Sequence, residues 1–130
     1  MVRFISMARL FVDHIVLFVK DVKRSRDFYS KFLKAPLHKD PHSVCYQIGE
    51  TKLFLALPYR KPRRKFEKEE LGLNHLAFGI RTLSELRGIE TRLNKVRIKN
   101  SGVQIDRYGK KPFIWFDDPD GMRLEFYLRK

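Results

Sequence analysis

The 130-residue sequence has very little cysteine: a single residue, Cys45, which excludes an internal disulfide. A lone thiol is typical of proteins from a reducing compartment. The N-terminus has neither the apolar core nor the small-residue cleavage site of a signal peptide, so we expect a cytoplasmic protein. Long apolar runs are also absent, because runs such as residues 15–19 and 53–58 are far shorter than the roughly 20 residues that cross a bilayer. These absences argue against a membrane protein and a secreted disulfide scaffold.

Acidic residues are scarce as well. There are 15 Asp and Glu against 28 Lys and Arg, which gives a formal net charge of +13 and a pI near 10.1. Such an excess is found in nucleic-acid-binding proteins. Six of the positive charges lie in residues 60–68, but no known nucleic-acid-binding motif accompanies them. We therefore interpret this run as a solvated linker, with guidance of an anionic substrate, or a weak nucleic-acid patch, as the functional alternatives.

The sequence consists of two similar halves. Residues 13–19 (DHIVLFV) and 74–80 (NHLAFGI) are apolar runs typical of strands, and each has a histidine at its second position. A helical pattern follows each run, capped by Asp21 in the first half and by Thr82 in the second. Further strands are predicted at residues 44–48 and 53–57, and at 102–105, 113–116 and 124–128. Both halves thus have the order strand–helix–strand–strand–strand. We expect one domain over residues 1–130, with modules at about 10–58 and 73–129 and a linker at about 59–72.

Equivalent positions in the two halves suggest a metal site. His14 corresponds to His75, and Glu125 corresponds to Phe54 on the closing strands. Two histidines and one carboxylate form a ligand set that leaves coordination positions open for a substrate. Strand alternation places Arg123 and Tyr127 on the same face as Glu125. The ordinary alternative is that the histidines are structural or solvent-exposed and that Glu125 forms a surface ion pair.

These residues resemble those of the vicinal oxygen chelate superfamily, which includes glyoxalase I, bleomycin-resistance proteins, extradiol dioxygenases and fosfomycin-modifying enzymes. The resemblance is carried by residues 13–15 and 26–29 in the first half, and by residues 72–78, 116–121 and 124–125 in the second. It implies an α+β fold in which two βαβββ modules form a half-open mixed sheet around a central cavity, with helices on the outer face. It also implies a homodimer, because many two-module members draw their site from both chains.

Carried over by position, the resemblance implies His14, His75 and Glu125 as ligands of a divalent metal: Fe, Mn, Zn, Ni or Co. The fourth ligand position of glyoxalase I falls on Phe54 or, with a shift of one residue, on Leu55, and neither can bind a metal. Glyoxalase I chemistry is therefore disfavoured, because the family uses a metal-bound carboxylate as the base. The nearest replacements are Gln47 and Glu50.

Three open coordination positions suit a substrate that chelates through two adjacent oxygens, as in the dioxygenases and fosfomycin-modifying enzymes. Val16, however, stands where fosfomycin thiol transferases usually carry threonine, so the substrate cannot be named. We predict Glu125 and Tyr127 as catalytic residues. The predicted substrate-binding residues are Tyr46, Trp115, Arg123 and Tyr127.

The leading hypothesis is a metal-dependent lyase, dioxygenase or transferase that acts on a small anionic substrate. The alternative is a metal-free binding protein of the bleomycin-resistance type, in which the histidines are structural. Nucleic-acid binding through the basic surface is a third hypothesis. His38 and His42 are assigned to an exposed loop, and Cys45 is assigned to the core.

Overall fold

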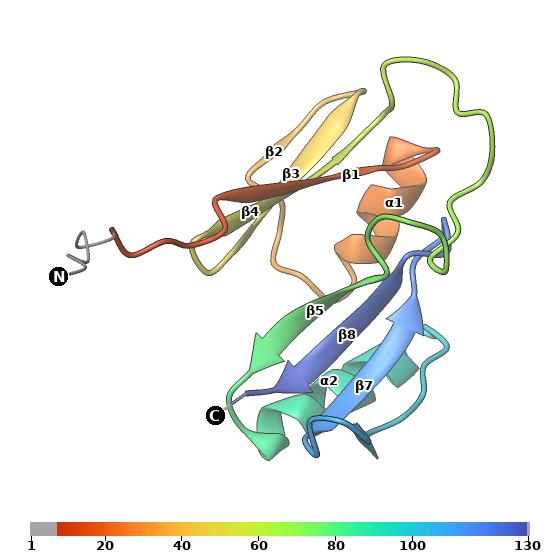
Figure 1. The fold of residues 1–130 in the computed structure, drawn as a ribbon. Coiled ribbons are helices and arrows are strands. Elements are labelled where there is room, and N and C mark those ends of the chain that lie inside the picture. The colour runs from red at the N-terminus through yellow and green to blue at the C-terminus, as the bar shows by residue number, and fades with distance from the viewer. Residues whose placement is uncertain (1–7, 130) are drawn as a thin grey trace, which may run out of the picture.

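The computed structural model describes residues 8–129 and contains two four-stranded sheets, one from each half of the chain (Figure 1). The first half forms β1 (His14–Phe18), α1 (Val22–Tyr29), β2 (His38–Lys39), β3 (Ser43–Ile48) and β4 (Thr51–Ala56). The second half forms β5 (His75–Ile80), α2 (Leu83–Lys95), β6 (Gln104–Ile105), β7 (Pro112–Asp117) and β8 (Arg123–Leu128). The prediction of an α+β fold with two βαβββ units is confirmed.

Two sequence-based expectations bear on membranes and secretion. Within residues 8–129, neither helix has the length and hydropathy needed to cross a bilayer. The expectation that no signal peptide is present depends mainly on residues 1–7, which lie outside the described residues.

The two sheets have the same topology. Their strand orders are β1-β4-β3-β2 and β5-β8-β7-β6, and in each sheet the first pair is parallel and the others are antiparallel. Val16 pairs with Phe54 on β4, and Ala77 pairs with Glu125 on β8. In each half the paired residue lies two positions after the histidine. The register therefore places Phe54 and Glu125 at equivalent positions.

Both helices begin at the predicted caps. The Asp21 side chain accepts a hydrogen bond from the Arg24 N–H at 3.0 Å, which satisfies one of the free donors of the first turn of α1. At α2, Thr82 accepts from the Glu85 N–H at 3.1 Å, and its hydroxyl donates to the Glu85 carboxylate at 2.8 Å. The capping-box pattern therefore marks the start of α2, although the carboxylate binds the Thr82 hydroxyl rather than its N–H.

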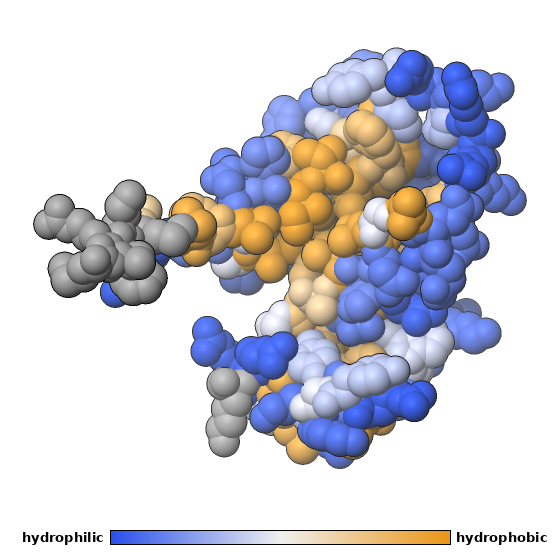
Figure 2. Space-filling view, viewed as in Figure 1, coloured by the Kyte–Doolittle hydropathy of each residue, from blue (hydrophilic) through white to orange (hydrophobic). Residues whose placement is uncertain are grey.

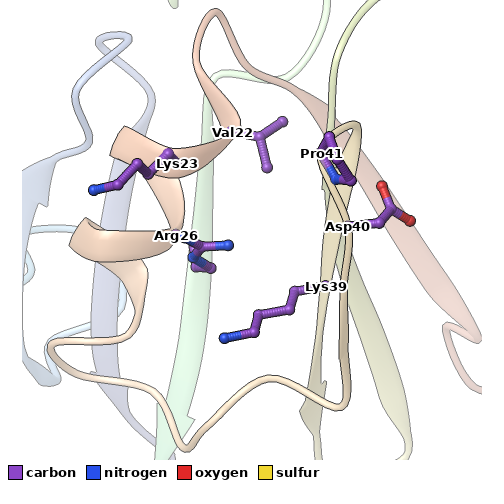
Figure 3. Close-up of a pocket in the computed structure, with 6 residues that line it drawn as sticks. All are labelled: Val22, Lys23, Arg26, Lys39, Asp40 and Pro41. Carbon is purple, nitrogen blue, oxygen red and sulfur yellow. The ribbon is translucent and has the colours of Figure 1, made fainter.

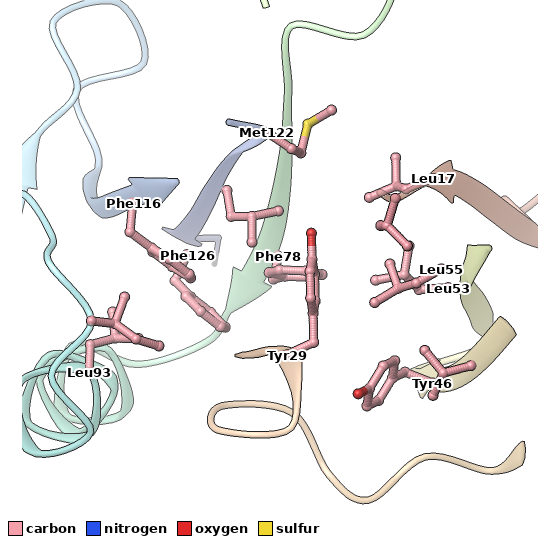
Figure 4. Close-up of a cluster of buried hydrophobic side chains, with 14 of the residues drawn as sticks. Leu17, Tyr29, Tyr46, Leu53, Leu55, Phe78, Leu93, Phe116, Met122 and Phe126 are labelled. Carbon is pink, nitrogen blue, oxygen red and sulfur yellow. The ribbon is translucent and has the colours of Figure 1, made fainter. Parts of the chain in front are cut away.

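Helix α1 packs between the two sheets rather than against its own sheet alone. Tyr29 is fully buried, and its ring lies 6.3 Å from that of Tyr46 on β3. Just beyond α1, the centre of the Phe32 ring lies 5.1 Å from that of Phe116 on β7 and 5.9 Å from that of Phe126 on β8. Figure 4 shows Tyr29 between side chains of the first sheet and those of the second. One continuous core therefore joins the two halves.

The turn between β7 and β8 ties the second half to α1. The Gly121 N–H donates to the Asp118 carbonyl at 3.0 Å, which closes the predicted Asp-Pro-Asp-Gly turn. The buried Asp118 carboxylate accepts the Tyr29 hydroxyl at 2.7 Å. Asp120 accepts both the Arg24 guanidinium at 2.7 Å and the Lys20 N–H at 3.2 Å. Burial, and then the nearby Asp118 carboxylate, raise the pKa of Tyr29, so its hydroxyl stays protonated as a donor.

One local assignment differs from the sequence-based expectation. His38 was expected in a loop, but it lies in the short strand β2, where it pairs with Cys45. A strand of two residues has no alternating pattern that a sequence could display. His38 and His42 are both exposed, and Cys45 is buried, as expected.

We expect Tyr29→Phe to lower the free energy of unfolding by about 1–3 kcal/mol, because it leaves the buried Asp118 carboxylate without its hydroxyl donor. Urea denaturation measures the change. Tyr108→Phe is the matched control, since Tyr108 is 84% exposed, and its effect should stay within about 0.5 kcal/mol. Equal effects of the two substitutions would show that the Tyr29–Asp118 contact does not stabilise the fold.

Candidate metal and substrate site

Each sheet has one face against the helices and one open face. On β8, Leu124 and Phe126 are buried toward α1 and α2, so Glu125 lies on the opposite face. On β5, the buried Phe78 likewise leaves His75 on the open face. The candidate ligands of the second half therefore project from the same open face.

His75 and Glu125 are close together. The His75 Nε2 lies 3.8 Å from the Glu125 Oε1, and their side chains are 43% and 14% exposed. Burial raises the pKa of the Glu125 carboxyl, while the charges of His75 and Arg123 act to lower it. An imidazole nitrogen and a partly buried carboxylate thus face each other at the rim of the sheet.

The neighbouring Asn74 sets the orientation of the His75 ring. The His75 Nδ1 lies 2.8 Å from the Asn74 Oδ1, and the Asn74 Nδ2 donates to the Lys68 carbonyl at 2.8 Å. Because the Asn74 amide nitrogen donates to a carbonyl, the amide oxygen faces Nδ1 and must accept a hydrogen bond from an N–H at that position. The proton-free nitrogen of a neutral His75 is then Nε2, the atom that faces Glu125.

His14 lies on the open face of the first sheet and has the same local arrangement. Its Nδ1 lies 2.8 Å from the Asp13 carboxylate. Its ring makes an edge contact with Phe54, with 5.9 Å between ring centres, where His75 has Glu125. Within residues 8–129 of one chain, no three His, Cys, Asp or Glu side chains come close enough to hold a metal ion. The structure therefore brings His75 and Glu125 together but leaves His14 on the other sheet.

Trp115 and Arg123 extend the open face beside Glu125. The Arg123 guanidinium lies 3.8 Å from the centre of the Trp115 ring, and its Nε donates to the Asp117 carboxylate at 2.6 Å. A guanidinium stacked on an aromatic face and paired at one nitrogen has a defined plane. This pair forms a flat, positively charged patch next to His75, whose strand position pairs with that of Arg123.

The Tyr127 hydroxyl is already hydrogen-bonded. It donates to the Asp106 carboxylate at 2.8 Å, and this bond raises the pKa of Tyr127. Asp106 also accepts the Gly109 N–H, which bends residues 106–111 over the Tyr127 ring end. Sequence reasoning missed Asp106 and Gly109, and only the glycine in the segment between β6 and β7 was a signal for a turn there.

Tyr46 corrects the predicted set of substrate-binding residues. It is 1% exposed, and its hydroxyl contacts the Ser30 hydroxyl at 2.7 Å and donates to the Arg26 carbonyl at 3.2 Å. Alternation along β3 directs Tyr46 toward α1, so it belongs to the core and not to the open face. The strand had been placed correctly, but the sequence did not show which of its faces the helix covers.

Comparison with known proteins agrees with this architecture. The family model of the glyoxalase/bleomycin resistance protein/dioxygenase superfamily matches residues 11–126. The chain belongs to this superfamily.

Individual relatives cover nearly the whole chain. The uncharacterized protein YaeR of Escherichia coli is 28% identical over 89% of this chain and 94% of its own length. The metallothiol transferase FosB of Lysinibacillus sphaericus is 30% identical over 89% of this chain and 80% of its own. The crystal structure of a glyoxalase family protein from Enterococcus faecalis has a TM-score of 0.71 and 25% identity, and covers 90% of this chain and 96% of that one.

The residue beside the first histidine differs from its counterpart in the second half of the chain. Phe54 is half-buried against His14 at the position that Glu125 holds beside His75. Gln47 and Glu50 were considered as ligands in place of Phe54, but neither is hydrogen-bonded to His14 within residues 8–129. The Gln47 amide donates to the Gly49 carbonyl at 2.7 Å, and Glu50 is exposed in the following turn. The first half therefore supplies one candidate ligand and the second half supplies two.

We expect Gly109→Ala to break the contact between Tyr127 and Asp106, because a Cβ at this position would collide with the Tyr127 hydroxyl. The free energy of unfolding should fall by about 1–3 kcal/mol when this substitution is made in the wild-type protein. When Gly109→Ala is made in the Tyr127→Phe protein, the loss of unfolding free energy should be smaller, because the clashing oxygen is absent. Gly88→Ala is the control, since no atom lies within 4 Å of its Cβ and alanine favours the helix by up to about 1 kcal/mol. Denaturant unfolding of the four variants measures these effects, and equal losses in both backgrounds would contradict the assignment.

Proposed function

We propose that this protein is a metal-dependent enzyme that binds a small anionic substrate through two adjacent oxygens at a site made of His14, His75 and Glu125. The observation that supports this most directly is the 3.8 Å approach of the His75 Nε2 to the Glu125 Oε1, with the other ring nitrogen held by Asn74. Dioxygenase, lyase and transferase chemistry all fit this ligand set.

The residues fit a divalent ion. Imidazole nitrogen and carboxylate oxygen bind such ions at about 2.0–2.2 Å, so two ligands of one ion stand about 3 Å apart. The separation of 3.8 Å closes to this value with a side-chain movement of less than about 1 Å. Nitrogen and oxygen ligands accept Fe, Mn, Zn, Ni or Co. When bound, the ion would act as a Lewis acid toward the substrate oxygens.

Other residues of the open face would recognise the substrate. The stacking on Trp115 and the bond to Asp117 hold the Arg123 guanidinium in one plane, suited to a carboxylate or another planar anion. The Tyr127 hydroxyl, which donates a hydrogen bond to Asp106, would accept a hydrogen bond from a substrate hydroxyl. Glu125 would serve as a ligand. The proposed site lacks the second carboxylate that isomerisation of the glyoxalase I type uses, because Phe54 occupies that position.

A second copy of the chain would supply the third ligand. Val16 and Phe18, which share the open face with His14, are 50% and 57% exposed, and the preceding Phe11 is 57% exposed. Figure 2 shows apolar surface continuing from the part of the chain just after the grey residues across the first sheet. In the proposed homodimer, the open face of the first sheet of one copy covers the open face of the second sheet of the other. The contact buries the apolar strip and brings His14 to His75 and Glu125.

Metal analysis of untagged protein tests the proposal. We expect about one divalent ion per chain after dialysis, and loss of most of it in His75→Ala, since one of three ligands is removed. His42→Ala is the control, because this histidine is exposed and no hydrogen bond of its ring is seen in residues 8–129. Unchanged metal content in His75→Ala, or no bound ion above background, would favour the metal-free binding protein instead.

Mixing two variants that each lack one ligand tests whether the site is shared between two chains. We expect His14→Ala and Glu125→Gln each to lose metal. When they are unfolded and refolded together, half of the dimers are mixed, and each mixed dimer has one site with all three ligands intact. About a quarter of the wild-type metal content should therefore return. A site built within one chain would recover none, which would refute the shared arrangement while leaving the ligand set open.

A further inference from the structure

A second candidate binding site lies between α1 and the hairpin of β2 and β3, and no residue of the open faces described above lines it. The hollow has a volume of about 380 Å³ (Figure 3). Such a volume is within the range of small-molecule sites. Its lining residues are Val22, Lys23, Arg26, Lys39, Asp40 and Pro41.

The one carboxylate in the lining does not neutralise the hollow. Asp40 accepts hydrogen bonds from the His38 ring at 2.9 Å and from the N–H groups of His42 and Ser43 at 2.7 and 2.9 Å. The bond from His38, followed by those from the backbone, lowers the pKa of Asp40 to about 2. Figure 3 shows its carboxylate pointing away from α1. Asp40 is therefore ionised, but its oxygens are used within the hairpin turn.

Two of the three cations have no carboxylate partner in residues 8–129. Lys23 pairs with Asp27 at 2.9 Å, whereas no ion pair within 4 Å is found for Arg26 or Lys39 in that part of the chain. Figure 3 shows both side chains directed into the hollow, one from α1 and one from β2. Arg26 is also partly buried. Two cations that face the same space repel each other, and an anion placed between them removes this repulsion.

We propose that this hollow binds the phosphate group of a small molecule. A guanidinium offers paired N–H donors to two oxyanion oxygens, and a lysine ammonium adds a mobile point charge, which together suit a tetrahedral oxyanion. Val22, which is 5% exposed, and Pro41 provide an apolar wall for a short organic part of the ligand. The site does not depend on the proposed metal centre, because no candidate metal ligand lines it.

Titration of metal-free protein with inorganic phosphate, followed by amide NMR spectra at constant ionic strength, tests the site. We expect saturable shifts at Val22, Arg26 and Lys39, with a dissociation constant of about 1–10 mM for a solvent-open site. Arg26→Gln and Lys39→Gln should each weaken binding about fivefold or more. Lys34→Gln, which removes the same charge from an exposed position in the same half, should leave binding unchanged.

The outcomes separate clearly. Linear, non-saturating shifts would show general attraction to a basic protein and would overturn the proposal. Equal weakening by Lys34→Gln would have the same meaning. Because two independent variants are used, a folding defect in one, visible in its own spectrum, leaves the other as the test. Titration with chloride at matched ionic strength should produce no saturation at these amides, and saturation there would also count against a phosphate site.

Discussion

The packing of α1 between two sheets is the constraint on which the rest of the structure depends. A helix of eight residues is not stable alone in water, because nucleating a helix is costly, so α1 depends on packing against the rest of the chain. Tyr29 contacts the first sheet through Tyr46, and it contacts the β7–β8 turn of the second half through Asp118. Because both sheets use one face for this shared core, both opposite faces remain open to solvent. The position of one short helix thus decides where every candidate functional residue can act.

The open faces of the two sheets carry unequal sets of candidate ligands. His75 has a carboxylate beside it, whereas His14 has an aromatic ring at the same register. Each histidine is preceded by a residue whose side chain holds its Nδ1, Asp13 in one case and Asn74 in the other. The repeated local geometry therefore prepares Nε2 in both halves, although a carboxylate accompanies only one of them. In metal sites generally, a hydrogen bond to the other ring nitrogen orients the histidine that binds the metal.

The basic charge of the chain is distributed over distinct local settings. Arg24 is paired with Asp120 across the two halves, and Arg123 is paired with Asp117 and stacked on Trp115. In the connector, Arg64 pairs with Glu70 at 3.1 Å. Net charge therefore says little by itself, because its effect depends on which cations already have partners.

The fold and the equivalence of Phe54 and Glu125 were predicted correctly from the sequence, because both follow from patterns within short segments. Apolar periodicity, the caps at Asp21 and Thr82 and the Asp-Pro-Asp-Gly turn are properties of short segments, and an internal repeat transfers the register from one half to the other. Alternation also placed Arg123 and Tyr127 with Glu125. The predicted ligand set His14, His75 and Glu125 stays a prediction, since only the last two meet in one chain.

What the tertiary structure alone decided depends on contacts between distant segments. It showed that α1 covers the Tyr46 face of β3, that Asp106 accepts a hydrogen bond from the Tyr127 hydroxyl, and that Asn74 links His75 to the Lys68 carbonyl. None of these follows from periodicity, because alternation separates the two faces of a strand without stating which face a helix covers. The sequence by itself thus determined the two helices, the longer strands and their register. Only packing determined which faces are buried, which side chains meet, and that His14 lies on a different sheet from His75 and Glu125.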